Sequence, residues 1–252
     1  MAEATRREAA RASLATGRRA LRREMPPRYA PELDLRPKFD AMVVPLVRSA
    51  GDVLDVGSGR MPTFGLEDRN PSGTYVGLDL DAAELDAAPP GSYDRAIASD
   101  ATTFVPELEG QFDLIISWQV LEHVKDLDAA IENLRRYLRP GGQLVAQFSG
   151  TFGLFSLLSR AVPQRVTPWL LERLYRRPRT TTFPAYYHHC WATALERAGA
   201  SWSTFEVLPR HEGAGYFRFS RFVQAGYLAY EEWAEQRGHD NLASYYVIVG
   251  QR

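Results

Sequence analysis

The chain has 252 residues, of which 45% are apolar and 24% are charged, as in an ordinary soluble domain. Its formal net charge of −1 provides no general attraction to nucleic acid. Cys190 is the one cysteine, which excludes an intramolecular disulfide and suits a reducing compartment. No apolar run is long enough to cross a bilayer, and the arginine-rich N-terminus lacks the apolar core of a secretory signal. We therefore expect a cytoplasmic protein.

The first half of the chain alternates predicted helices with predicted strands. Ala, Arg and Glu favour a helix over 3–24, and periodic apolar residues predict another over 34–50. A third helix is expected over 126–138, capped by Asp126 and stopped by the Arg-Pro-Gly-Gly of 139–142. Apolar runs predict strands at 53–56, 75–78, 95–98, 112–117 and 143–148. This alternation predicts parallel βαβ units with right-handed crossovers.

Beyond residue 149 the alternation stops. Residues 150–184 form an insertion broken by prolines, and a helix is predicted over 186–198. Two last strands, at 203–208 and 245–249, flank an aromatic-rich helical insertion over 217–237. We interpret the whole chain as one domain with four parts: an N-terminal helical cap 1–50, a core 51–149, a lid-like insertion 150–185 and a C-terminal part 186–252.

The segment Val53-Leu54-Asp55-Val56-Gly57-Ser58-Gly59 is an apolar strand that runs into a glycine turn. Asp79 ends the next strand, in Val76-Gly77-Leu78-Asp79. Glycine accepts positive φ and lets a ligand approach the backbone, and a carboxylate can accept from both hydroxyls of a ribose. This spacing is typical of an α/β domain that binds an adenosine-containing cofactor.

These two motifs and three others resemble the class I S-adenosylmethionine-dependent methyltransferases, of the small-molecule group often called type 11. The others are Ser99-Asp100-Ala101, then Phe112-Asp113-Leu114-Ile115-Ile116-Ser117 with Val120-Leu121-Glu122-His123-Val124, and Leu138-Arg139-Pro140-Gly141-Gly142. Together the five cover residues 51–148 in the family's order. No single motif suffices, but the ordered set is highly specific.

The resemblance implies a doubly wound, Rossmann-like sheet of seven strands, with helical insertions after strand five and between the last two strands. Those last two strands would form an antiparallel hairpin. The resemblance also implies S-adenosylmethionine as the cofactor. Asp55, Gly57, Ser58 and Gly59 would hold its methionine end, Asp79 its ribose with Leu80 beside it, and Asp100 and Ala101 its adenine, while Ser117 and Gln119 would line the floor beneath the sulfonium.

One segment departs from the family pattern. The usual third glycine is Met61, and three further residues interrupt the region of the first crossover helix, namely Pro62, Gly65 and Pro71. We expect a short or irregular segment there. Arg60 is a candidate substitute partner for the methionine carboxylate, through charge-assisted hydrogen bonds.

Two histidines are candidates for a catalytic base, His123 and His188. His123 follows the fourth strand, where ligands gather in open α/β sheets, although a cofactor contact or a packing role is the alternative. His188 lies in a His-His-Cys run. Adjacent residues of a helix point about 100° apart, so we expect one histidine to face the pocket and the other to face solvent or core, and we expect no metal site.

The insertion mixes apolar residues with arginines over 152–179. This pattern fits a lid over the cofactor, or a basic amphipathic surface that contacts a membrane or a phosphorylated, lipid-like acceptor. The arginines of the N-terminal helix leave a similar choice between a solvated face and an arm that attracts anions.

The sequence thus predicts an O-methyltransferase acting on a small molecule such as a sugar, a glycolipid or another natural product, with no nucleic-acid partner. One alternative is a partner protein that has this fold without the reaction. Another is a nicotinamide-dependent oxidoreductase, although Pro62 stands where the third glycine of its usual motif would be. The oligomeric state is left open.

Overall fold

The computed structural model describes residues 35–153, 156, 185–217 and 220–252. The helix expected over 3–24 and most of the insertion expected over 150–184 lie outside these residues. Within them, no helix is both long enough and apolar enough to span a bilayer.

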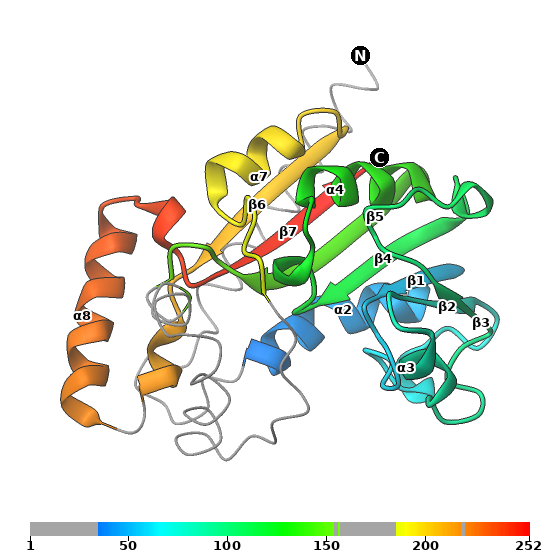
Figure 1. The fold of residues 1–252 in the computed structure, drawn as a ribbon, viewed down its shortest axis with the longest axis horizontal. Helices are drawn as coiled ribbons and strands as arrows, with labels where there is room; N and C mark the ends of the chain where they lie inside the picture. The colour runs from blue at the N-terminus through cyan, green and yellow to red at the C-terminus, as the bar shows by residue number, and fades with distance from the viewer. Residues whose placement is uncertain (1–34, 154–155, 157–184, 218–219) are drawn as a thin grey trace. The chain divides into compact units, whose positions relative to one another are not determined.

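Seven strands form one sheet, in the order β3-β2-β1-β4-β5-β7-β6 (Figure 1). Strands β1 to β5 pair in parallel, and β7 runs antiparallel to both of its neighbours. The predicted seven-stranded sheet with a terminal antiparallel hairpin is therefore confirmed. The strands are β1 Asp52–Val56, β2 Thr74–Asp79, β3 Arg95–Ala98, β4 Phe112–Trp118, β5 Leu138–Ser149, β6 Thr204–Arg210 and β7 Tyr245–Gln251.

Helices cover both faces of this sheet, and several begin at a side-chain cap. Asp126 caps α4 by accepting the N–H of Ala129, as the sequence predicts, and Ser220 caps α8 through Val223 N–H. Within the residues that the structure describes, the α-helices are α2 Leu35–Ser49, α3 Ala82–Asp86, α4 Leu127–Tyr137, α7 Ala192–Ala198 and α8 Arg221–Gln236. Short 3-10 turns are η1 Leu66–Asp68, η2 Pro106–Leu108, η3 Leu121–His123, η5 Gly213–Phe217 and η6 Asp240–Leu242.

Two apolar cores follow from the alternation of side chains along the strands. On one face, Leu54 and Ile115 pack with the apolar stripe of α4 and with Leu195 of α7. On the other, Val53 and Ile116 pack with Phe39 and its neighbours on α2. Figure 1 shows α4 and α7 together on one side of the sheet and α2 on the other. Burial on both faces explains why the central strands are continuous apolar runs.

Two expected boundaries are wrong. The helix predicted over 186–198 begins only at Ala192, because Tyr187 and His189 have left-handed backbones (φ 52° and 59°) that a helix cannot contain. The strand predicted over 143–148 already begins at Leu138, because residues 139–142 form a bulge within β5; pairing with β4 passes from Phe112↔Leu138 directly to Leu114↔Gln143.

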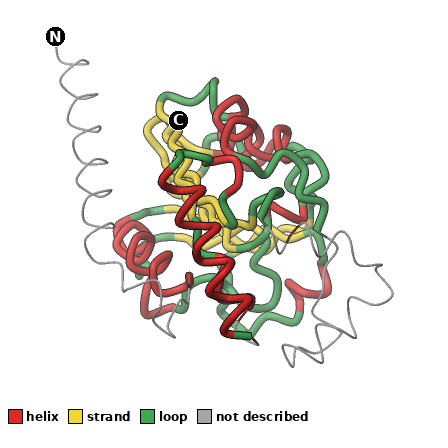
Figure 2. The backbone as a smooth tube through the Cα atoms, turned by 90° about the vertical axis from the view of Figure 1, so that its left-hand side faces the viewer, coloured by secondary structure: helices red, strands yellow, loops and turns green. Residues whose placement is uncertain are grey.

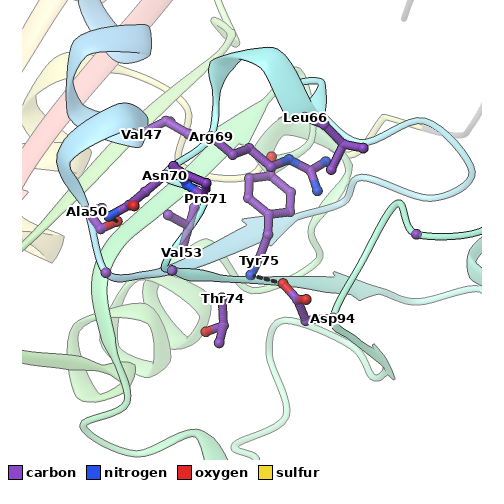
Figure 3. A pocket seen from close by; sticks show the side chains of 13 residues that line it. Val47, Ala50, Val53, Leu66, Arg69, Asn70, Pro71, Thr74, Tyr75 and Asp94 are labelled. Atoms are coloured by element: carbon purple, nitrogen blue, oxygen red, sulfur yellow. Dashed lines mark hydrogen bonds between the residues drawn. The ribbon is translucent and has the colours of Figure 1, made fainter.

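The first crossover is irregular, as the sequence predicts, and contains only η1. It encloses a cavity of about 230 Å³ at the amino ends of β1 and β2. Figure 3 shows this cavity between the end of α2 and the crossover, with Arg69 beside the ring of Tyr75; the guanidinium carbon lies 3.5 Å from the ring centroid. In open α/β sheets ligands bind at the carboxyl ends of the strands, so this cavity lies at the wrong edge for a cofactor.

Candidate cofactor and acceptor site

The glycine turn after β1 packs directly against the turn after β4. Gly57 and Gly59 have positive φ values of 74° and 51°, which side chains rarely adopt. A Cβ atom added to Gly57 would lie 2.3 Å from Cγ2 of Val120. The Gly57 N–H donates to the carbonyl of Leu78 (2.7 Å), which ties the turn to β2. Both the backbone conformation and the available space therefore require glycine at position 57.

Asp55 is completely buried, and the protein itself occupies both of its carboxylate oxygens. Thr63 donates to it through its N–H and its hydroxyl, each at 2.6 Å, and the Tyr75 hydroxyl donates at 2.7 Å. Burial raises the pKa of Asp55, whereas the hydrogen bonds from Thr63 and Tyr75 oppose that shift. Asp55 therefore holds the irregular crossover against β1 and β2. The sequence identified this acid but not its three donors.

Asp79 stands at the carboxyl end of β2, next to the glycine turn. Its Oδ1 accepts the N–H of Asp81 (2.9 Å), and a Cβ atom on Gly59 would lie 3.5 Å from its Oδ2. Burial raises the pKa of Asp79, although the N–H groups of Asp81 and Gly59 act in the opposite direction. Leu80, the next residue, is 72% exposed. The carboxylate and the glycine backbone thus face the same small space.

The other predicted cofactor residues lie along the same edge of the sheet. Asp100 follows β3, and its Oδ1 accepts the N–H and the hydroxyl of Thr102, both at 2.8 Å. The carbonyl of Ala101 accepts the side-chain amide of Asn133 (3.0 Å). Ser58 is buried and donates its hydroxyl to Asp55 O (3.3 Å), which stabilises the turn from inside.

Arg60 is already paired. Its guanidinium donates twice to the carboxylate of Glu84, at 2.6 Å for each bond. This fork raises the pKa of Arg60 through the Glu84 hydrogen bond, and it lowers the pKa of Glu84. A methionine carboxylate would have to compete with Glu84 for this side chain.

Ser117, near the end of β4, and Gln119, just after it, make different contacts. Ser117 is fully buried and donates to the carbonyl of Val56 (3.1 Å), so it joins β4 to β1. Gln119 has a left-handed backbone (φ 56°), which is unusual outside glycine and recurs at functional sites. Its N–H donates to Gln147 O (2.7 Å), and its side-chain oxygen accepts the hydroxyl of Ser149 (3.1 Å).

Two buried polar side chains near Gln119 were missed from the sequence. Glu122 Oε1 accepts the N–H of Ser149 (3.2 Å), but within the described residues its Oε2 has no hydrogen-bond partner, and neither has Nε2 of Gln147. Gln147 and Ser149 lie on the same face of β5, about 7 Å apart along the strand. Buried polar atoms without partners are rare in proteins and call for an explanation. Glu122 follows the carboxyl end of β4, and Gln147 lies two residues before the carboxyl end of β5.

The two candidate histidines lie on different segments, His123 in the turn after β4 and His188 in the segment before α7. His123 directly follows Glu122 in η3. His188 is exposed, and its ring stacks on that of His189 at 4.4 Å, while His189 Nδ1 lies 3.0 Å from Asp128 Oδ2. The expectation that the two rings diverge is wrong, because His188 and His189 lie in a turn and the helix begins only at Ala192.

We expect Glu122→Gln to stabilise the protein at neutral pH by about 1–2 kcal/mol. Burial raises the pKa of Glu122, while the charge of His123 opposes the shift. The folded state therefore holds a proton that the unfolded state releases near pH 4.3, so stability falls as pH rises above about 4.3 toward the raised pKa. Glutamine has no proton to release and removes this loss.

Urea unfolding of both proteins between about pH 4 and pH 8 measures this effect. The gap between variant and wild type should open as pH rises. A gap that stays constant across this range would show that Glu122 does not titrate with a raised pKa.

Comparison with known proteins agrees with this architecture. A family model described as a methyltransferase domain matches residues 18–202, which is well over half of the chain. The chain belongs to the class I S-adenosylmethionine-dependent methyltransferases. This membership removes the nicotinamide-dependent alternative and agrees with the five ordered motifs.

Two members of the methyltransferase family match part of the chain. An uncharacterized methyltransferase of Mycolicibacterium gilvum is 34% identical over 106 residues, 41% of each chain. A ubiquinone biosynthesis O-methyltransferase of Pseudomonas paraeruginosa is 34% identical over 98 residues, 36% of this chain and 41% of its own. The matched region thus spans about two fifths of these relatives.

A solved structure of a methyltransferase has the same fold as this chain. A SAM-dependent methyltransferase from Archaeoglobus fulgidus superposes with a TM-score of 0.52 at 14% identity, covering 88% of this chain and 95% of its own. At this identity the likeness extends to the fold alone.

The residues at the carboxyl edge fit the family's cofactor. S-adenosylmethionine carries a ribose diol and an adenine amino group, which need acceptors, and a methionine end that must approach the backbone closely. Asp79 supplies a carboxylate beside Gly59, and Asp100 Oδ2 accepts no bond that we observe from the described residues. The left-handed glycine turn supplies the close approach.

Proposed function

We propose that this protein transfers the methyl group of S-adenosylmethionine to an oxygen atom of a small-molecule acceptor. The observation that carries the proposal is the pair of buried, unpartnered polar atoms at the carboxyl edge, Glu122 Oε2 and Gln147 Nε2. The carboxyl oxygen can accept the proton of a hydroxyl group, and the amide N–H can donate to a neighbouring oxygen of the same acceptor. An acceptor bound there would satisfy atoms that the protein leaves unpaired.

We propose the following cofactor contacts. Asp79 accepts hydrogen bonds from the ribose hydroxyls, with Leu80 beside it. Asp100 and Ala101 contact the adenine. The backbone of the Gly57-Ser58-Gly59 turn lies against the methionine end. Asp55 acts indirectly, because its oxygens are already bonded to Thr63 and Tyr75. Ser117 and Gln119 form the floor beneath the sulfonium. Gln119 also connects this floor to Glu122 and Gln147, which we propose bind the acceptor.

The bound cofactor supplies a methyl group on a positively charged sulfur, which a nucleophile can displace. The chain's part is to align the acceptor and to exclude water. A hydroxyl with a high pKa also needs a proton acceptor within hydrogen-bond reach. Glu122 now joins His123 and His188 as a candidate. The raised pKa of its buried carboxyl makes it a stronger base than an exposed glutamate.

Several observations support a small organic acceptor. The names of two relatives, the ubiquinone biosynthesis O-methyltransferase and a trans-aconitate 2-methyltransferase, refer to small molecules. Near Glu122, the rings of Tyr216 and Tyr245 stack with centroids 6.2 Å apart. Tyr245 is buried, so the partly exposed ring of Tyr216 is the one that can pack against a sugar ring or a flat natural product. We therefore keep a sugar, a glycolipid or another natural-product hydroxyl as the proposed acceptor class.

A thermal-shift titration with S-adenosylhomocysteine tests the cofactor half of this proposal, with NADH as comparator. Ligand at about one hundred times its dissociation constant should stabilise the wild type by roughly 2.7 kcal/mol. Asp79→Ala should weaken binding roughly tenfold to hundredfold, since it removes charge-assisted hydrogen bonds to the ribose.

Asp86→Ala is the matched control, because Asp86 is an exposed acid at the end of α3, seven residues along the chain. It should bind as the wild type does. No shift with S-adenosylhomocysteine would overturn the proposal and favour a partner protein that has kept only the fold.

A further inference from the structure

The outer face of α8 carries no exposed charge over three turns. Between residues 222 and 233 its exposed residues are all apolar: Phe222, Val223, Ala225, Gly226, Ala229 and Trp233. Phe222 is 92% exposed and Trp233 is 46% exposed. A surface helix normally presents charged or polar residues to water, so an apolar face of this length indicates a contact surface.

The inner face of α8 is fixed to the domain, so the outer face is presented rigidly. Tyr227 and Leu228 are buried with the residues of η5. Buried Glu231 accepts the N–H groups of Gly213 (2.7 Å) and Ala214 (3.2 Å) and the hydroxyl of Ser244 (2.8 Å). Figure 2 looks from the side on which α8 lies in Figure 1 and shows this helix at the front.

We propose that this face of α8 binds the same face of a second copy of the chain, with the two helices antiparallel about a two-fold axis. The face has a large ring near each end and small residues between them, and nothing lies within 4 Å of a Cβ atom built on Gly226. Phe222 and Trp233 are about 16 Å apart along the axis. An antiparallel pair therefore sets Phe222 against the partner's Trp233 and Gly226 against the partner's Ala229, which is self-complementary as a two-fold contact requires.

Charge also favours this arrangement over other partners. The first turn of α8 has no acidic residue, while its last turns carry Glu232 and Glu235. Antiparallel packing brings these glutamates toward the positive N-terminal end of the partner helix. The same glutamates would be repelled by an anionic membrane surface.

The area is sufficient for a reversible dimer. Phe222, half of Trp233 and the smaller residues between them expose roughly 500 Å² on each copy, or about 1,000 Å² in total. This is near the lower limit for a specific protein interface, so we expect a dissociation constant on the order of micromolar.

Sedimentation of the full-length chain over a range of concentrations tests the proposal. The wild type should dimerise reversibly, and Phe222→Asp should weaken association by at least about 100-fold, since it places a charge at the centre of each end contact. Leu66→Asp is the matched control, because Leu66 is 70% exposed on η1, far from α8 in sequence. It should dimerise as the wild type does, and both variants should still bind S-adenosylhomocysteine.

Single-cysteine variants test the orientation, because the native Cys190 is fully buried. An equilibrated mixture of Phe222→Cys and Trp233→Cys should form an interchain disulfide under mild oxidation, while neither variant alone should do so. A monomeric wild type, a Phe222→Asp variant that dimerises normally, or crosslinking of Phe222→Cys with itself would each overturn the proposal.

Discussion

Gly57→Ala is expected to weaken S-adenosylhomocysteine binding by about 100-fold or more. The added Cβ would lie 2.3 Å from Val120 Cγ2, and φ at this position is 74°. Either the glycine turn or the turn after β4 must therefore move. A misplacement near 1 Å can cost about 100-fold in a catalytic rate, and we expect a loss of similar size in affinity. Isothermal titration measures the affinity, and thermal unfolding measures the accompanying loss of stability, about 2–4 kcal/mol.

Two further variants separate backbone strain from the steric clash. Gly238 has a similar φ of 66° but no atom within 4 Å of the added Cβ, so Gly238→Ala should cost about 1 kcal/mol and leave binding intact. Adding Val120→Ala to Gly57→Ala should restore part of the lost affinity, because it removes the clashing methyl groups. Wild-type affinity in Gly57→Ala would show that the turn does not form the binding surface.

Asp55→Ala is expected to lower the free energy of unfolding by about 3–5 kcal/mol. The carboxylate accepts three hydrogen bonds in a fully buried position, and its removal leaves the N–H and hydroxyl of Thr63 and the hydroxyl of Tyr75 without their acceptor. The irregular crossover would lose its main attachment to the sheet. Urea unfolding measures the change.

Asp52→Ala on the same strand is the control. Asp52 lies at the surface, where it pairs with Arg139 at 2.6 Å with both side chains about one third exposed, and Arg139 keeps Asp113 as a second partner. Its loss should cost about 1 kcal/mol or less. If Asp55→Ala cost no more than Asp52→Ala, the buried carboxylate would not be the anchor that the geometry indicates.

Most of the sheet could be predicted because its central strands are buried on both faces. Continuous apolar runs such as Leu114–Ile116 are typical of strands buried on both faces, in a chain where strands and helices alternate. The predicted helix boundary at 186 was wrong because long-range contacts determine the backbone conformation there. The N–H groups of Tyr186 and Tyr187 both donate to Glu122 O, more than sixty residues earlier, and no local pattern near 186 predicts this attachment.

In the site too, residues set by a local sequence pattern could be predicted, whereas contacts set by distant segments could not. The glycine turn and Asp79 are local signals, so the sequence predicted them, and their positions at one edge follow from the topology. The donors to Asp55 come from the irregular crossover and from β2, so they depend on a path that the sequence does not specify. Glu122 offered a signal that we missed, since it is an acid inside the apolar run Val120–Val124. A charged residue in such a run is often buried for a reason other than packing.

Val120 fills the space that the missing side chain of Gly57 leaves open, so the glycine turn that we propose holds the cofactor and the turn that leads to Glu122 share one contact. A ligand that tightens either loop changes the free energy of ordering the other. Thermodynamic reciprocity then requires that, if the cofactor raises acceptor affinity by some factor, the acceptor raises cofactor affinity by the same factor.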